Sequence, residues 1–195
     1  MAAKTSQLEK CIIPNAQQYN MGMAVRDEHD RTNIYSSDAP EAHAREAKNT
    51  YEIVQGYLNS EAGNSFVDYV HSRGKEFMKI KGIGSGDLGE GVVAAILRND
   101  LEGILLSNYD GKGFAERISE MADKYHLTHE ATTEYVLAHE LAHAAGYKAE
   151  AETEGFIKQY FESRAFQTQG EEREKYVQLA GVAAEREKEA KGMEE

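Results

Sequence analysis

The distribution of proline is the feature that most limits the folds open to this 195-residue chain. Both prolines, Pro14 and Pro40, lie near its start, and residues 41–195 contain none. Because proline breaks helices and marks loops, its absence favours a largely helical body. The first 39 residues are polar and show no hydrophobic periodicity. We therefore expect an irregular N-terminal arm over residues 1–39 and one domain over residues 40–195.

Hydrophobic periodicity predicts the helices of this domain. They are expected over residues 41–58, 60–80, 114–125, 128–146, 149–166 and 172–189. Ser60 and Thr128 suit helix N-caps, and Gly146 suits a helix end because glycine adopts left-handed conformations. The glycine-rich segment 81–91 is expected to be a loop. Residues 92–106 could form short strands or a broken helix, because periodicity does not distinguish the two in runs this short. The predicted fold class is mainly α, or α+β with a small sheet around residues 92–108.

Charge and composition exclude several classes of partner. The formal net charge of −12 would repel a phosphate backbone, so a nucleic-acid partner is not expected. Cys11 is the one cysteine, so no disulfide can form within the chain. The N-terminal sequence lacks the features of a secretory signal, and no apolar run approaches the roughly 20 residues that span a bilayer. We expect a cytoplasmic protein without a membrane partner.

The motif with the clearest chemistry is His-Glu-Leu-Ala-His at residues 139–143. Residues four apart share one face of a helix at about 6 Å, so His139 and His143 can bind one zinc ion. Glu140 leaves the helix about 100° from His139, beside the metal. There it can accept a proton from a metal-activated water that attacks a peptide bond. The motif predicts zinc as cofactor and Glu140 as general base.

A zinc site of this kind needs a third ligand from another part of the chain. In the pattern HExxHxxGxxH this ligand would stand at position 149, but Ala149 cannot bind a metal. The next segment offers carboxylates instead, at Glu150, Glu152, Glu154 and Glu162. A helical hairpin that turns near Tyr147 would bring residues 152–155 level with the histidines, which favours Glu154.

This region resembles the gluzincin group of zinc metallopeptidases, closest to its minimal single-domain members, in His139, Glu140, His143 and the run Glu154, Gly155, Phe156. The resemblance covers residues 132–161. It implies a zincin-like active-site helix followed by a helix whose glutamate, Glu154, completes the zinc site with both histidines. It also implies that Glu140 is the base and that the substrate is a peptide or protein. Glu150 remains an alternative ligand, because in some relatives the ligand glutamate has an acidic residue four positions later, as Glu150 has Glu154.

Two other classes of protein remain open for the same motif. A helical protein could bind a metal through these residues without catalysis. Glu140 and His143 also form the ExxH pair of di-iron carboxylate bundles, which require a second such pair. The nearest approaches to a second pair are Asp68 with His71 and Asp123 with His126.

Smaller features add further hypotheses. Gly84, Gly86 and Gly89 spell GxGxxG, but a dinucleotide site needs a strand before this sequence, and we expect a loop near the active site instead. The thiolate of Cys11 could bind the zinc and keep the enzyme latent.

Substrate contacts are less clear from the sequence. Tyr160 and Tyr176 are candidates for stabilising the oxyanion. Residues 101–108 are the candidate edge strand that would bind an extended peptide through main-chain hydrogen bonds.

Overall fold

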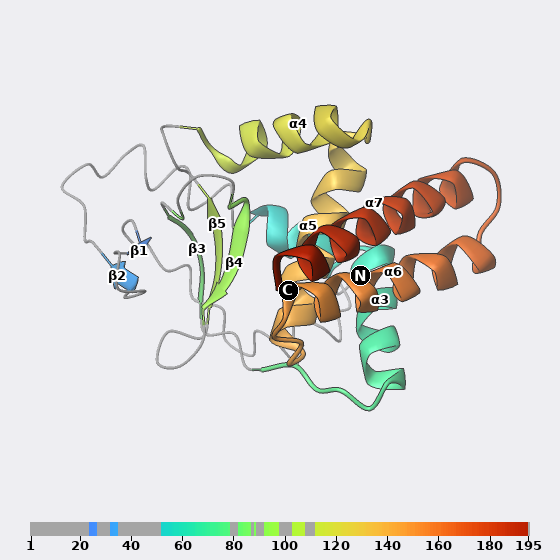
Figure 1. The fold of residues 1–195 in the computed structure, drawn as a ribbon, viewed down its shortest axis with the longest axis horizontal. Coiled ribbons are helices and arrows are strands. Elements are labelled where there is room, and N and C mark those ends of the chain that lie inside the picture. Colours follow the sequence, from blue (N-terminus) through green and yellow to red (C-terminus); the bar gives the residue numbers. More distant parts are fainter. Residues whose placement is uncertain are drawn as a thin grey trace, which may run out of the picture.

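The computed structural model describes residues 24–26, 32–34, 52–78, 82–86, 88, 92–97, 103–107 and 112–194. This part of the chain is mainly helical, with a small sheet packed beside the helices (Figure 1). The predicted mainly helical fold with strands near residues 92–108 is confirmed. None of the described helices is both long enough and apolar enough to cross a membrane.

The strands are β1 (Ala24–Arg26), β2 (Thr32–Ile34), β3 (Gly82–Gly86), β4 (Ala94–Leu97) and β5 (Gly103–Ser107). The helices are α3 (Glu61–Ser72), α4 (Phe114–Tyr125), α5 (His129–Ala144), α6 (Glu150–Gln167) and α7 (Gly170–Glu194). Residues 52–58 are also helical, which is the described part of the predicted helix 41–58. β1 and β2 pair antiparallel within the N-terminal arm, and the other residues of the arm lie outside the described part.

The ends of α5 follow the caps expected from the sequence. Thr128 accepts a hydrogen bond from the backbone N–H of Ala131 at 3.1 Å, which satisfies one of the free donors at the start of the helix. At the other end Gly146 has a φ of +99°, the left-handed region that glycine occupies without strain. These two residues set the limits of the helix that carries His139 and His143.

The predicted helix 60–80 is too long. Ser60 does cap it, accepting from the N–H of Gly63 at 3.1 Å, but α3 ends at Ser72. Gly74 then turns the chain with a φ of +69°. The N–H of Met78 donates to the carbonyl of Ala144 at 2.8 Å. The apolar residues after Gly74 therefore pack against α5 from a non-helical segment, which hydrophobic spacing alone did not distinguish from another helical turn.

The predicted loop over residues 81–91 is also wrong in part, because Gly82–Gly86 form β3. β3 pairs in parallel with β5, and β4 pairs with the other side of β5 antiparallel, giving the order β3-β5-β4. Glycine is disfavoured in strands, and here main-chain pairing with the buried β5 overrides that preference. Gly84 and Gly86 lie within a strand, and in the described part of the chain no helix follows β3 directly, so the dinucleotide fingerprint has no support.

Helix α5 lies at the centre of the fold. It contacts β4, α3, α4, α6 and α7. Nearly every side chain from Ala131 to Ala144 is buried, as expected for a helix covered on all sides. An aromatic cluster joins α3 to α6, with Phe66 edge-on to Tyr160 at 5.0 Å between ring centroids. This packing joins two of the helices that contact α5.

Candidate metal centre

The two histidines of the motif converge on one carboxylate from the next helix. The Nε2 atoms of His139 and His143 lie 3.0 Å apart. The carboxylate of Glu150 places Oε2 3.2 Å from Nε2 of His139 and Oε1 3.3 Å from Nε2 of His143. Among the described residues these three form the one cluster of histidine and carboxylate side chains close enough to hold a metal ion.

The spacing of these atoms fits zinc. Ligand atoms about 2.1 Å from a tetrahedral zinc ion stand about 3.4 Å from one another. The contacts at 3.0, 3.2 and 3.3 Å approach that spacing, with the two from Glu150 made by different oxygens of its carboxylate. One ligand atom from each of the three residues lies within 4.8 Å of the other two. Two imidazoles and one carboxylate are also the donor set of catalytic zinc sites that leave a position free for water or substrate.

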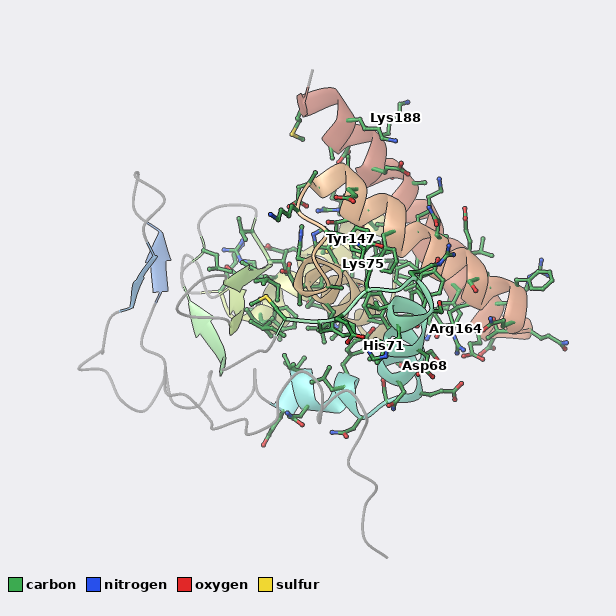
Figure 2. The ribbon with its side chains drawn as sticks, turned by 90° about the horizontal axis from the view of Figure 1, so that it is seen from below. Asp68, His71, Lys75, Tyr147, Arg164 and Lys188 are labelled. Atoms are coloured by element: carbon green, nitrogen blue, oxygen red, sulfur yellow. The ribbon has the colours of Figure 1, made fainter. Side chains whose placement is uncertain are left out.

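The outer nitrogen of each histidine is Nδ1, the ring nitrogen that does not face Glu150. In His143 this nitrogen is held by the loop that joins α5 to α6. Nδ1 of His143 lies 2.8 Å from the carbonyl oxygen of Tyr147. Because a carbonyl oxygen can only accept, Nδ1 carries the hydrogen and Nε2 keeps its lone pair for a metal. Lys75 lies 4.8 Å above the Tyr147 ring, so the segment after α3 steadies this loop (Figure 2).

The outer nitrogen of His139 faces Glu154. Nδ1 of His139 lies 3.2 Å from Oε1 of Glu154, an ion-pair distance without the angle of a good hydrogen bond. Glu154 is 1% exposed. It accepts hydrogen bonds from the hydroxyl of Tyr135 and from Nε of Arg186, the latter at 2.7 Å. Burial acts to raise the pKa of Glu154, but His139, Arg186 and Tyr135 outweigh it and hold that pKa below its usual value.

The structure therefore assigns different positions to the two candidate glutamates. Glu150 faces the inner nitrogens of both histidines, whereas Glu154, the expected third ligand, faces the outer nitrogen of His139. The alternative ligand, Glu150, fits the geometry better. A hairpin in which α6 returned alongside α5 would bring Glu154 level with the histidines. Instead α6 leads away across α5, and Glu150 is its first residue (Figure 1).

Opposite charges compensate one another within this cluster. Burial acts to lower the pKa of His139, but contacts with Glu150 and Glu154 and the charge of Glu140 outweigh it and raise that pKa to about 10. The same hydrogen bonds, to His139 and then His143, lower the pKa of Glu150. Two carboxylates thus surround an imidazole that is 8% exposed, which makes the site attractive to a cation.

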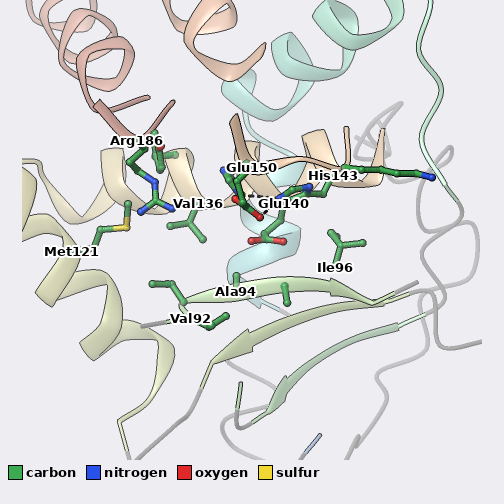
Figure 3. Close-up of a pocket in the computed structure, with 14 residues that line it drawn as sticks. Val92, Ala94, Ile96, Met121, Val136, Glu140, His143, Glu150 and Arg186 are labelled. Atoms are coloured by element: carbon green, nitrogen blue, oxygen red, sulfur yellow. Dashed lines mark hydrogen bonds and ion pairs between the residues drawn. The ribbon is translucent and has the colours of Figure 1, made fainter. Parts of the chain in front are cut away.

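Glu140 lies beside this cluster and points into a pocket. Its carboxylate occupies the space between Glu150 and strand β4 (Figure 3). The side chain is buried, and its Oε2 has no hydrogen-bond partner among the described residues. Burial raises the pKa of Glu140, and the charge of Glu150 adds to this, against the opposing effect of the histidines and Arg186. A carboxylate with a raised pKa and a free oxygen is suited to accept a proton.

The pocket has a volume of about 620 Å³ and joins the cluster to the edge of the sheet. Its lining consists of Val92 to Ile96, Met121, Tyr135, Val136, His139, Glu140, His143, Lys148, Glu150 and Arg186. Because side chains alternate along a strand, consecutive residues such as 92–96 line one pocket when the edge of the strand faces it. The expectation that residues 101–108 form the edge strand is wrong, since β5 is central and β4 is at the edge.

The sequence identified the histidines and glutamates that line the pocket, but not Tyr135 or Arg186, and its two candidates for stabilising the oxyanion lie elsewhere. Tyr160 donates instead to the carbonyl of Ala62 at 3.1 Å, and Tyr176 packs on Phe161, so neither lines the pocket. Arg186 does line it, but a single arginine in the highly charged α7 gives no signal in the sequence. Tyr135 could have been found, because it stands four residues before His139 on the same helical face.

The remaining hypotheses are affected as follows. Neither Asp68 with His71 nor Asp123 with His126 joins a metal-binding cluster in the described residues, so the structure offers no second site for two irons there. Cys11 lies outside the described residues.

Comparisons of the chain with known protein families, with curated proteins and with solved structures find no match.

Proposed function

We propose that this protein is a zinc-dependent metallopeptidase in which His139, His143 and Glu150 hold the metal and Glu140 is the general base. The observation that carries the proposal is the convergence of two Nε2 atoms and one carboxylate, 3.0 to 3.3 Å apart, beside a buried glutamate with a free oxygen. In this arrangement Glu154 contacts Nδ1 of His139, the nitrogen that does not face Glu150. This arrangement agrees with the resemblance to gluzincins, in which the ligand glutamate can have an acidic residue four positions later.

Each residue has a separate part in the proposed reaction. A bound zinc ion would supply Lewis-acid activation of water and of the scissile carbonyl. Glu140 accepts a proton at its free carboxylate oxygen and returns it to the nitrogen of the departing amine. The surrounding apolar side chains, among them Val136 and Met121, limit access of bulk water to that carboxylate.

The substrate is proposed to lie along β4. An extended peptide can add to the edge of β4 that has no neighbouring strand in the described part of the chain, and main-chain hydrogen bonds would then position it without regard to sequence. Ala94 and Ile96 face the pocket opposite Glu140 (Figure 3). The scissile bond would therefore cross the pocket between β4 and the metal ligands.

The test is cleavage of a peptide library by wild type, Glu140→Gln and Glu152→Gln. We expect Glu140→Gln to bind zinc normally and to lose cleavage by about 10²–10⁴-fold, the usual contribution of a general base. Glu152 is an exposed residue of the same part of α6 as Glu150, so Glu152→Gln should cleave like wild type. Wild-type protein that binds zinc but cleaves nothing would support the non-catalytic metal-binding alternative. Redox-active iron in place of zinc would support the di-iron alternative.

A further inference from the structure

The C-terminal helix reaches the metal centre through one side chain. Helix α7 packs along α6 (Figure 1). Its register is marked by Glu187, which lies 3.5 Å from Lys158 and against the backbone of Gly155, where an added Cβ would stand 3.3 Å from the Glu187 carboxylate. This close approach brings Arg186 to the pocket, beside Val136 and Met121 (Figure 3).

Arg186 and His139 meet at the same carboxylate oxygen. Oε1 of Glu154 lies 2.7 Å from Nε of Arg186 and 3.2 Å from Nδ1 of His139. The other oxygen accepts from Tyr135. Because Glu154 is 1% exposed, water cannot easily replace any of these partners. The contacts thus form a chain from α7, through α6, to a ligand on α5.

We propose that Arg186 is a positioning residue of the metal centre, which holds Glu154 against His139 and thereby makes tight zinc binding depend on the docking of α7. This inference rests on the proposed zinc site. Partners of the outer nitrogen fix the orientation of a metal-binding imidazole, and their loss typically weakens metal binding by about 10–100-fold. Without Arg186, Oε1 of Glu154 would lose its closest donor, and the carboxylate would no longer be held at the position that faces His139.

A general effect of α7 on stability must be separated from this specific effect. The chain offers a matched control, because Lys175 of α7 also pairs with a buried glutamate of α5. Its Nζ lies 2.9 Å from Oε2 of Glu134, which is buried. Glu134 is not among the residues that line the pocket with His139 and His143. Loss of the Lys175 pair should weaken the docking of α7 without changing the surroundings of His139.

The experiment measures the zinc dissociation constant by competition with a chromophoric chelator, together with the thermal midpoint of the zinc-free protein. It compares wild type with Arg186→Met, Arg186→Gln, Arg186→Lys and Lys175→Met. We expect about 10–100-fold weaker zinc binding for the Met and Gln variants. Arg186→Lys should be intermediate, because it keeps the charge but not the geometry of the guanidinium. Lys175→Met should lower the thermal midpoint and leave the dissociation constant within about twofold of wild type.

Each outcome is decisive. If wild type binds zinc and the Arg186 variants bind it equally well, this inference is overturned while the proposed zinc site stands. Equal weakening by Lys175→Met and Arg186→Met would also overturn it, since the effect would then be a general one of helix docking. Failure of wild type to bind zinc would overturn the proposed function and this inference together. Should Arg186→Met fail to fold, Arg186→Gln gives the same comparison.

Discussion

Replacement of Tyr135 by Phe should destabilise the zinc-free protein by an amount that the structure allows us to estimate. Tyr135 is 1% exposed, and its hydroxyl donates to Oε2 of the buried Glu154. Phenylalanine keeps the ring and its stacking on Phe161, with 6.1 Å between centroids, and removes that donor alone. A hydrogen bond to a charged group contributes about 1.5–3 kcal/mol. We expect the free energy of unfolding to fall by this amount.

Tyr160→Phe is the matched control for this substitution. Tyr160 is also 1% exposed, and its hydroxyl donates at 3.1 Å to the neutral carbonyl of Ala62. A bond between neutral groups contributes about 1 kcal/mol, so Tyr160→Phe should cost less than Tyr135→Phe. Urea denaturation in the presence of EDTA gives both values, with the m-value as a check that the surface exposed on unfolding has not changed.

The two substitutions together test whether Glu154 is ionised. If Tyr135→Phe costs no more than Tyr160→Phe, then Glu154 is not an ionised acceptor that depends on Tyr135. The account of the support behind His139 would then be wrong, whatever the zinc content of the protein.

Two further predictions concern the helices around the site. Gly63→Ala should destabilise the protein by about 1–3 kcal/mol, because its Cβ would stand 2.2 Å from the carbonyl oxygen of Tyr57. In Gly56→Ala the added Cβ meets nothing within 4 Å, so this substitution should stabilise its helix by up to about 1 kcal/mol. Similar free energies of unfolding for the two variants in urea denaturation would contradict this expectation. Burial raises the pKa of Tyr57 and of Tyr160 well above that of free tyrosine, so their contribution to stability is complete below about pH 10 and is lost as the pH rises further. Tyrosinate absorbance at 295 nm from these two residues should therefore appear together with loss of helical circular dichroism. The variants Tyr57→Phe and Tyr160→Phe show which part of the absorbance comes from each residue. Ionisation of either tyrosine while the protein is still folded would count against its burial.

The local parts of the fold were predictable because their signals are local. The cap at Thr128, the left-handed Gly146 and the spacing of the apolar residues between them define α5 from neighbouring residues alone. The histidine pair follows from helix geometry, since residues four apart must share a face. The sequence therefore predicted the motif helix and the shared face of its two histidines.

The parts that could not be predicted from the sequence depend on contacts between distant segments. The strand β3 exists because β5 pairs with its glycine-rich backbone, and no property of Gly82–Gly86 alone indicates that partner. The choice between Glu150 and Glu154 depends on the angle at which α6 leaves the loop after α5. Arg186 reaches the site only because of the register between α6 and α7. The partner of β3, the direction of α6 and the register of α7 all depend on residues far apart in the sequence, so no short segment predicts them.

The measurement that tests the central claim most directly is elemental analysis of purified wild type, His143→Ala, Glu150→Ala and Glu154→Ala after exposure to zinc and removal of excess metal. We predict about one zinc per chain in wild type, its loss in His143→Ala and Glu150→Ala, and its retention, with weaker affinity, in Glu154→Ala. Zinc that is retained in Glu150→Ala and lost in Glu154→Ala would assign the third ligand to Glu154. Wild-type protein that binds no zinc would contradict the metal centre itself and the peptidase activity proposed from it.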